Sequence, residues 1–443
     1  MRAAIRAGRL APGVRVPASR VLAADLGVSR GVVVEAYQRL LDEGLVTARA
    51  GAGTVVSTLG AAAPPSGVTT DRRTGAGIRL PVPVPAGIRY DLSPGVPDLS
   101  AFPRAAWLRA ERAVLDGSTG SDLGYGDPGG HPVLRRELAG WLARSRGVRA
   151  EPDDVIVVSG VAQALALLMQ TLRANGTTEV AVEDPGSRGA RDQMVHWGVR
   201  PVGVPVDDEG VRVDALRAAG VDAVVLTPAH QFPTGVVLSP ARRRDLLDWP
   251  GLVIEDDYDA EHRYDRAPVA ALQASAAARV AYAGSTSKSL APGMRLGWLI
   301  APARLRPTLL AAKHASDLGN PTLPQLVLAR LLATGDYERH LRAVRTRQRR
   351  RRDALLDGLR SHLPSARVTG VAAGLHLVVT LPGDTPDTEL ALACAAEGVM
   401  VQPLSWHRHA PGPPGLVLGY AASTPDRLRE AAALIASAAG RRQ

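Results

Sequence analysis

Lys288 is the residue whose chemistry stands out most in this sequence. Of the 53 basic side chains, only Lys288 and Lys313 are lysines, and all the others are arginines. Lys288 follows an apolar run at residues 279–284, in the string AGSTSKSLAPGMRLGW, where the end of a strand is expected. A lysine amine can lose its proton and form an imine with a carbonyl compound, which a guanidinium cannot do. We therefore interpret Lys288 as a covalent attachment point; an ordinary surface lysine is the alternative, and it is our expectation for Lys313.

Two other motifs could act beside this lysine. Asp256 closes an apolar run in IEDDYDAE, and Tyr258 adds a phenol two residues later, although such an acid is more often a helix cap or an ion-pair partner. The string SGVAQAL opens a helix directly after a strand, so the backbone N–H groups of residues 160–162 can bind a phosphate. Any strand-to-helix turn offers such amides, so the second motif is weak when taken alone.

The elements that must position these motifs are strands that alternate with helices. The β-branched runs are VIVVSG (155–160), EVAVEDP (179–185), DAVVLTP (222–228), GLVIEDD (251–257) and RVAYAGS (279–285). This alternation predicts an α/β fold with a mostly parallel sheet, in which ligands bind at the carboxyl ends of the strands. Because all three motifs follow strands, we expect them to meet at one edge of the sheet.

The composition changes along the chain and suggests its division. Residues 58–86 are rich in Gly, Pro, Ala and Thr and lack a sustained apolar period, as expected of a tether. We predict a first domain at 1–57, a linker at 58–86 and a larger domain at 87–443, with a small C-terminal subdomain at about 335–443. The arginine cluster RTRQRRRR at 345–352 lies in a polar helical pattern and predicts a solvated helix face.

The first 57 residues carry the pattern of a helix-turn-helix. One face of a short helix is predicted from Val21, Leu22 and Leu26, Gly27 ends that helix, and Ser29 can cap the next one by accepting a hydrogen bond from a backbone N–H. The second helix has one apolar stripe, and its outward residues resemble those of a recognition helix. The stripe consists of Val32, Val33, Ala36, Tyr37, Leu40 and Leu41, and the outward residues are Arg30, Gly31, Val34 and Gln38.

Positive charge is concentrated in the same segment. Residues 1–57 hold eight arginines and four acids, a net charge of +4, and LVTARAGAGTVVS at 45–57 predicts a two-stranded wing with Arg49 at its tip. Cations placed in this way can hold phosphates or guanine edges. The expected DNA contacts are Arg20, Ser29, Arg30, Arg49, Gly53 and Thr54. A purely structural three-helix module would show the same apolar stripe and is the alternative.

The segment from IRAGRLAPG to GAGTVVS resembles the winged-helix DNA-binding domain of GntR-type bacterial regulators over about 53 residues. The resemblance implies binding to double-stranded operator DNA. Two features depart from the family pattern. The first helix, which usually has several more residues, is truncated by Met1, and Gly31-Val32-Val33 stands where a threonine-bearing stretch is more usual, which bears on base preference.

The motifs of the larger segment, in their order, resemble a fold-type I aminotransferase domain. They are SGVAQAL, EDP, HQFPTG (230–235), EDDY and STSKSLAPGMRLGW. Behind a GntR-type domain, this makes the whole chain similar to MocR/GabR-type regulators. The resemblance implies pyridoxal 5′-phosphate (PLP) on Lys288 as an internal aldimine, Asp256 keeping the pyridine nitrogen protonated, and Tyr258 hydrogen-bonded to the ring hydroxyl.

The resemblance also implies how the cofactor's phosphate is held. The phosphate ligands would be Arg295, Ser285, Ser287 and the turn Gly160-Val161-Ala162. An arginine and a helix N-terminus both neutralise a phosphate dianion. Tyr125, in LGYGDPGGHPVLRREL, would reach the phosphate of a neighbouring subunit, which implies a homodimer.

Two positions depart from the aminotransferase pattern. Ser187 stands where an aromatic residue near the cofactor is common, and Val417 stands where amino-acid transaminases place an arginine for the substrate carboxylate. We therefore expect little or no turnover. Further polar candidates for the pocket are His230, Arg188, Trp406, His407 and Arg408, for each of which a surface or packing role is the more common alternative.

Composition narrows the function classes. The single cysteine, Cys394, cannot form an internal disulfide, and the sequence shows no secretory segment and no apolar run of ~18 residues, so we expect a cytoplasmic protein without a membrane partner. The leading hypothesis is a PLP-dependent transcriptional regulator that binds operator DNA as a dimer and senses an amine, an amino acid or PLP itself. The alternative is a working aminotransferase with a secondary or lost DNA-binding role. No metal is expected.

Overall fold

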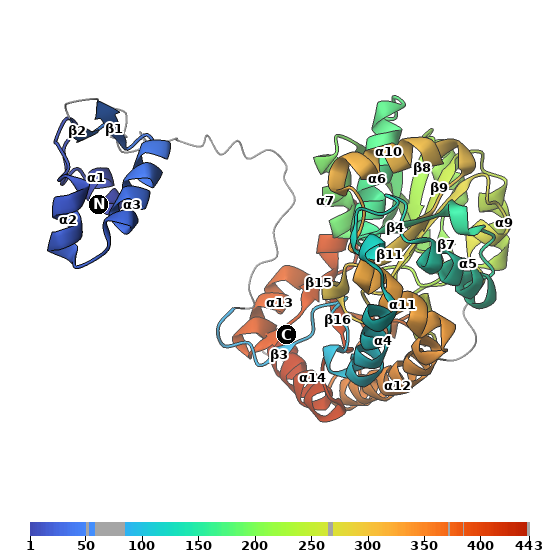
Figure 1. Ribbon diagram of the computed structural model, residues 1–443. Helices are drawn as coiled ribbons and strands as arrows, with labels where there is room; N and C mark the ends of the chain where they lie inside the picture. The colour runs from blue at the N-terminus through green and yellow to red at the C-terminus, as the bar shows by residue number, and fades with distance from the viewer. Residues whose placement is uncertain (50–52, 58–84, 265–268, 371–372, 384, 441–443) are drawn as a thin grey trace. The chain divides into compact units, whose positions relative to one another are not determined.

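The computed structural model describes residues 1–49, 53–57, 85–264, 269–370, 373–383 and 385–440. The chain forms two compact units, Met1–Gly75 and Ala76–Gln443 (Figure 1). The linker predicted at 58–86 lies outside the described residues, apart from its last two positions.

The N-terminal unit has three helices and a two-stranded wing. These are α1 (Arg2–Arg6), α2 (Ser19–Leu26), α3 (Arg30–Asp42), β1 (Val46–Arg49) and β2 (Gly53–Val56), and the two strands pair antiparallel. Val33, Tyr37 and Leu40 of α3 are buried in the core, and Tyr37 donates a hydrogen bond of 2.7 Å to the carbonyl oxygen of Pro17. As predicted, Gly27 ends α2, with a left-handed φ of 64°.

Some details of the helix-turn-helix prediction are wrong. Val21 and Leu26 of α2 and Val32 and Ala36 of α3 are exposed. The cause is geometric, because each helix of this small unit meets its neighbours along one narrow line and not over a broad stripe. Ser29 stands at the N-cap of α3, but its side chain accepts no capping hydrogen bond within the described chain.

The larger unit is built on an eight-stranded sheet in the order β4-β11-β10-β9-β8-β5-β6-β7. The strands are β4 (Val155–Val158), β5 (Glu179–Asp184), β6 (Arg200–Asp207), β7 (Gly210–Val211), β8 (Ala223–Leu226), β9 (Leu252–Asp257), β10 (Val280–Ser285) and β11 (Gly297–Ile300). From β10 to β6 all neighbours are parallel, as predicted, whereas β11 runs antiparallel to both β10 and β4, and β7 to β6.

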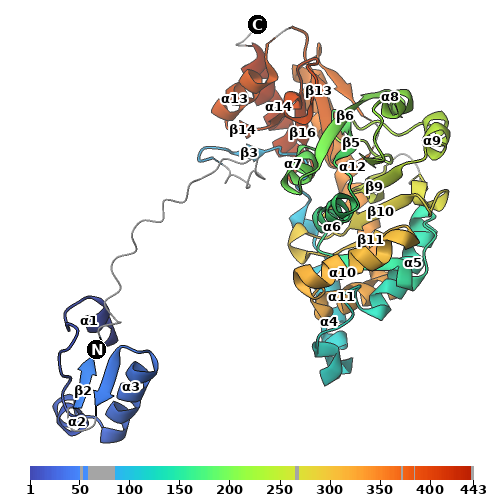
Figure 2. The same cartoon turned by 90° about the horizontal axis from the view of Figure 1, so that it is seen from above.

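Helices cover both faces of this sheet, as Figure 2 shows. One face packs against α6 (Val161–Ala174), α7 (Arg188–His196) and α10 (Arg306–Asp317). The other face packs against α5 (Pro132–Arg146), α8 (Val213–Ala218), α9 (Pro240–Leu247) and α11 (Thr322–Ala333), and α4 (Arg104–Gly117) lies against α11. The strands are apolar on both sides because both sides are covered.

The C-terminal part adds a four-stranded antiparallel sheet in the order β12-β13-β16-β15. Its strands are β12 (Arg367–Thr369), β13 (His376–Thr380), β15 (Gln402–Pro403) and β16 (Leu416–Gly419), and its helices are α12 (Asp336–His362), α13 (Asp387–Ala396) and α14 (Pro425–Gly440). Helices α12 and α14 pack side by side (Figure 1). The first strand of the unit, β3 (Tyr90–Asp91), pairs with β14 (Val399–Met400).

Short 3₁₀ helices complete the described elements. They are η2 (Leu99–Ala101), η3 (Gly120–Leu123), η4 (Pro152–Asp154), η5 (Ala260–His262), η6 (Leu272–Ala274), η7 (Pro292–Met294), η8 (Ala303–Leu305) and η9 (Leu404–His407). In the described parts of the chain, no helix combines the length and apolar character needed to cross a membrane.

The arginine cluster of α12 is not the fully solvated face that was predicted. Arg351 is buried, and both Arg351 and Arg347 form ion pairs with the buried carboxylate of Asp98, at 2.9 and 2.8 Å. The helix is covered there because the segment that follows β3 passes over it. Sequence periodicity cannot show that a helix is covered by a segment about 250 residues away in the chain.

Candidate functional site

Three consecutive acids of strand β9, Glu255, Asp256 and Asp257, alternate between the two faces of the sheet. Asp257 accepts hydrogen bonds from the Arg146 guanidinium at 2.7 and 3.0 Å and from the Tyr282 hydroxyl at 2.5 Å. Glu255, on the same face, accepts from the backbone N–H groups of residues 272 and 273. Asp256 points the other way, and its buried Oδ1 has no hydrogen-bond partner in the described chain. It is thus the one acid of this strand left available for a ligand.

Asp256 and Lys288 lie in a shared electrostatic environment. Burial raises the pKa of Asp256 to about 7, the nearby acids add to this, and Lys288 opposes it. Burial lowers the pKa of the Lys288 amine, against the attraction of Asp259 and Asp256. The Lys288 Nζ donates a hydrogen bond of 2.5 Å to the carbonyl oxygen of Gly95. An amine with a lowered pKa is unprotonated more often, which is the state that reacts with a carbonyl group.

Lys313 corrects one sequence expectation. It is fully buried, and its Nζ donates to both carboxylate oxygens of Asp317, at 3.0 and 2.9 Å. The surface position that was predicted for Lys313 is wrong, because α10 turns this side chain inward beside its i+4 acid. The two lysines of the chain therefore have different surroundings, and of the two it is Lys288 that lies near Asp256.

The turn that precedes α6 forms a cradle with the loop after β10. Gly160 has φ +92°, and a Cβ added there would lie 3.4 Å from Arg295 Nη1 and 3.7 Å from Ser287 Oγ. Arg295 itself adopts a left-handed φ of 50°, and its guanidinium donates to the carbonyl of Ser159. Residues 161 and 162 begin α6, so their free N–H groups face the same space. The cradle can hold a dianion such as a phosphate.

The serines of the loop differ in their roles. Ser285 is buried, and its hydroxyl accepts a hydrogen bond of 3.3 Å from the backbone N–H of Ser287. Ser285 therefore shapes the loop, whereas the Ser287 hydroxyl lies beside Gly160.

Tyr258 is fixed by a buried imidazole. Its hydroxyl lies 3.0 Å from His230 Nδ1, which also lies 2.9 Å from Asp259 Oδ2. Burial raises the pKa of Tyr258 well above its ordinary value, so the phenol stays protonated. Phe232 packs edge-on to the Tyr258 ring at 6.1 Å. Of the additional polar candidates, His230 is thus brought to the site.

Of the remaining polar candidates, Trp406, His407 and Arg408 lie at and just after η9, and Arg188 reaches Trp406 from α7. Arg188 stacks over the Trp406 ring at 5.5 Å, and Arg191 donates to the carbonyl oxygens of Trp406 and His407, at 2.6 and 3.0 Å. The ring of His407 packs against Phe232 at 5.0 Å. Arg191 was missed in the sequence, where an arginine on an amphipathic helix looks solvated.

Two further residues of this region have local roles. Ser187 caps α7 by accepting from the N–H of Ala190 at 3.3 Å. The Arg408 guanidinium packs so closely against Gly412 that an added Cβ there would lie 2.1 Å from its Nη1.

Val417 lies in an apolar environment. It is fully buried on β16, opposite Val378 of β13, and forms a small cluster with Val378 and Leu404. This cluster contains no cation in the described chain, so nothing in it can pair with a carboxylate.

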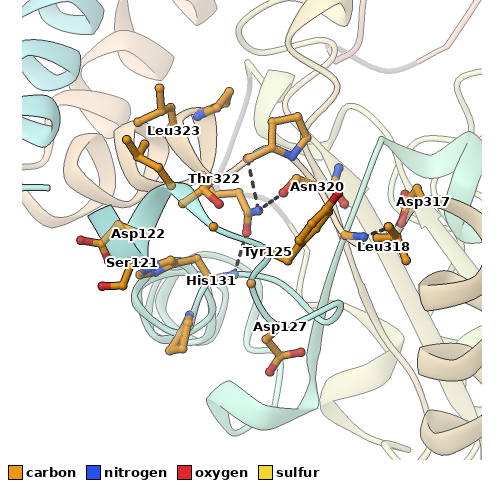
Figure 3. A pocket seen from close by; sticks show the side chains of 18 residues that line it. Ser121, Asp122, Tyr125, Asp127, His131, Asp317, Leu318, Asn320, Thr322 and Leu323 are labelled. Carbon is orange, nitrogen blue, oxygen red and sulfur yellow. Dashed lines mark hydrogen bonds between the residues drawn. The ribbon is translucent and has the colours of Figure 1, made fainter. Parts of the chain in front are cut away.

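Tyr125 lies apart from the groups above. Its side chain is 92% exposed and lines a pocket of about 760 Å³, where Figure 3 shows it among His131, Leu318 and Asn320. Tyr125 makes no hydrogen bond within the described part of the chain. Asn320 donates to the Ser159 hydroxyl at 3.0 Å, so the pocket borders the turn of Gly160.

The expected DNA contacts lie on the N-terminal unit. Arg20, Ser29 and Arg30 are exposed, with Arg30 as the first residue of α3. Gly53 and Thr54 begin β2, and Arg49 pairs with Gly53 in the strand register. The side chain of Arg49 and the turn at 50–52 lie outside the described residues. The side chain of the arginine that begins α3 is therefore exposed at the N-terminus of this helix.

Each of the two units matches a known protein family. Residues 90–435 match the family described as aminotransferase class I and II, and residues 1–56 match the gntR family of bacterial regulatory proteins. The probable rhizopine catabolism regulatory protein MocR of Rhizobium meliloti is 33% identical over 451 residues, covering 97% of this chain and 90% of the relative. The pyridoxine biosynthesis transcriptional regulator PdxR of Corynebacterium glutamicum is 33% identical over 448 residues, covering 99% and 94%.

Among solved structures, the kynurenine aminotransferase of Pyrococcus horikoshii has a TM-score of 0.74 at 27% identity, covering 81% of this chain and 92% of that one. An archaeal alanine:glyoxylate aminotransferase has a TM-score of 0.73 at 27% identity, covering 80% and 91%. An aminotransferase fold of this class implies dependence on PLP.

Proposed function

This chain belongs to the aminotransferase class I and II family and carries a gntR-family domain in residues 1–56, and on that basis we propose that it is a transcriptional regulator that senses a small amine, an amino acid or PLP at its aminotransferase-like site. The predicted fold-type I architecture and the resemblance to MocR-type regulators are confirmed. The relatives whose names state regulation share both parts with this chain over nearly its whole length.

The observation that carries the proposal is the fit of the site to PLP. Asp256 has a buried oxygen without a described partner, where the pyridine nitrogen would need a carboxylate. Gly160 leaves room for a phosphate beside Arg295, Ser287 and the N-terminus of α6. When bound, PLP supplies an aldehyde for covalent capture of an amine and a ring that withdraws electrons.

Each residue of the site would have its own role in binding the cofactor and the amine. Lys288 would hold the cofactor and exchange it for an incoming amine, and its lowered pKa favours the proton-free amine that this exchange requires. Asp256 would hold a proton on the ring nitrogen, and Tyr258, fixed by His230, would donate to the ring hydroxyl. Gly160, Val161, Ala162, Ser287 and Arg295 would bind the phosphate, with Ser285 supporting their loop.

The proposal includes the assembly and its DNA partner. Residues 1–57 would bind operator DNA, residues 58–86 would act as the tether, and residues 87–443 would form the sensor. The exposed Tyr125 would complete the site of a second subunit, so the sensor would be a homodimer. Since its partner is DNA, the protein would act in the cytoplasm.

The test is fluorescence anisotropy with a duplex from the chain's own upstream region. Affinity for the duplex should fall steeply with salt concentration. Arg30→Ala should lower this affinity, and it should reduce the slope of log affinity against log salt concentration by about one, as expected for the loss of one phosphate contact. The control is Arg39→Ala on the same helix, because Arg39 is paired with Glu35. Amines that bind the sensor should change the affinity for DNA, and Lys288→Ala should abolish that response. Steady turnover of an amino acid with 2-oxoglutarate and no affinity for any duplex would favour the aminotransferase instead.

A further inference from the structure

A second cavity lies between α5 and α12, and Lys288 is not among the residues that line it. Its volume is about 180 Å³, and its wall is formed by Trp141, Ser145, Arg146, Glu261, Glu338, Leu341, Arg342 and Arg345. The four residues of α12 are spaced at i, i+3, i+4 and i+7, so they form one face of that helix. Arg146 pairs with Asp257, which lies on the face of β9 opposite Asp256, so the cavity lies behind the strand that carries the main site.

The charged groups of this cavity are not paired with one another. Glu261 is 94% buried, since only 6% of its surface is exposed, and its carboxylate accepts a hydrogen bond from its own backbone N–H but forms no ion pair within 4 Å in the described chain. Glu338 Oε2 is buried and likewise without a partner in the described chain. Arg345 donates through Nε to the backbone carbonyl of Glu261, and the guanidinium of Arg342 has no described partner.

Two other arginines of α12 are paired with acids. Arg339 pairs with Asp336 at 2.7 Å, and Arg347 pairs with Asp98 at 2.8 Å. A buried carboxylate without an ion-pair partner is costly, and burial raises the pKa of Glu261 accordingly. Besides Arg146, which pairs with Asp257, the wall holds two acids and two cations with no ion pair between them in the described chain, and one guest that carries both charges can satisfy all four.

We propose that this cavity binds a small zwitterionic amino carboxylate. The ammonium group would lie between Glu261 and Glu338, and the carboxylate would pair with Arg342 and Arg345 through charge-assisted hydrogen bonds. The short carbon skeleton would lie against Trp141. The volume is below the range of about 300–1,000 Å³ that is usual for drug-sized ligands, which limits the guest to a small amino acid.

The test is isothermal titration calorimetry of the full chain with glycine, L-alanine and β-alanine, while the visible spectrum of the cofactor is followed. Any spectral change reports binding at the main site and should be lost in Lys288→Ala, whereas the binding heat of the zwitterions should persist in that variant, because Lys288 does not line the cavity. Acetate and ethylamine, which each carry one of the two charges, should bind at least about tenfold more weakly. Glu261→Gln and Arg342→Ala should each lower the zwitterion affinity by about tenfold or more.

The control variant is Arg350→Ala, which removes another exposed arginine of α12 outside the cavity. Arg342 is itself exposed, so its removal tests the site without disturbing the core. If the affinity falls in Lys288→Ala but not in Glu261→Gln or Arg342→Ala, the ligand lies at the main site and the proposal is overturned. Absence of binding heat for all three zwitterions, with the main site still responding to amines, would mean that the cavity holds only water.

Discussion

The amine of Lys288 donates a hydrogen bond of 2.5 Å to the backbone carbonyl of Gly95, which lies 193 residues earlier in the chain. Gly95 has φ +81°, and a Cβ added there would lie 3.3 Å from Lys288 Nζ. The segment that enters the larger unit after β3 therefore forms a wall of the site. It is held in place by Asp98, whose carboxylate pairs with Arg347 and Arg351.

Gly95→Ala should weaken retention of the cofactor. The left-handed backbone costs an alanine about 1–2 kcal/mol, and the new methyl group crowds the amine that must hold the cofactor. Retention can be measured as the loss of the visible cofactor band during dialysis. The matched control is Gly87→Ala, because Gly87 has φ +94° but nothing within 4 Å of an added Cβ. Equal retention in both variants would contradict a role for Gly95 at the site.

Gly160→Ala should weaken phosphate binding. The methyl group would take up the space beside Arg295 and Ser287, and loss of one charge-assisted hydrogen bond lowers affinity by about tenfold or more. The measurement is a comparison of PLP with pyridoxal, which lacks the phosphate and should be much less affected. Gly176→Ala, beyond the other end of α6, is the control, since it has φ +90° and open space around it. An equal loss for PLP and pyridoxal would place the phosphate elsewhere.

The stability of the cofactor-free protein should depend on Asp256 between pH 4 and 7. Burial raises the pKa of Asp256 from 3.8 to about 7, so in this range the folded protein keeps a proton that the unfolded chain releases. The stabilisation is fully present below pH 4, falls by at most about 1.4 kcal/mol per pH unit as the pH rises, and is constant again above about pH 7.

Asp256→Asn should remove this contribution alone. The difference in unfolding free energy between the wild type and this variant, measured by urea denaturation, should therefore fall from pH 4 to 7. Glu183 also has a pKa raised to about 7 by burial, but it is present in both proteins and cancels. A difference that is independent of pH would contradict the buried and unpartnered state of Asp256.

Amino-acid turnover should be slow because of Val417. A carboxylate that lacks its arginine loses about 1.5–3 kcal/mol, which corresponds to roughly 10- to 150-fold in binding of substrate and transition state. The measurement is single-turnover conversion of the cofactor by L-alanine, compared with ethylamine. The two should react at similar rates, because the cluster of Val417, Val378 and Leu404 has no cation that would favour the carboxylate of L-alanine, which ethylamine lacks. Fast conversion by L-alanine that is abolished in Arg188→Ala or Arg408→Ala would show that another arginine supplies the pair.

Much of the architecture could be predicted from local sequence. The five β-branched runs became β4, β5, β8, β9 and β10, because strands covered on both faces must be apolar throughout. Gly27 ended α2, since it accepts a left-handed backbone without strain. The motifs of Lys288, Asp256 and Gly160 could be found because the ends of parallel strands face one edge, and the covalent chemistry of lysine is a property of residue type alone.

Only the tertiary structure decided which distant segments are in contact and in which direction each side chain points. Gly95 reaches Lys288, and Arg191 reaches the carbonyl oxygens of Trp406 and His407, across separations that no local pattern encodes. Lys313 was expected at the surface and is buried, because one turn of α10 places it against Asp317. Residue type fixes which chemistry a side chain can perform, whereas packing fixes its partners and exposure, and these determine its pKa and its availability to a ligand.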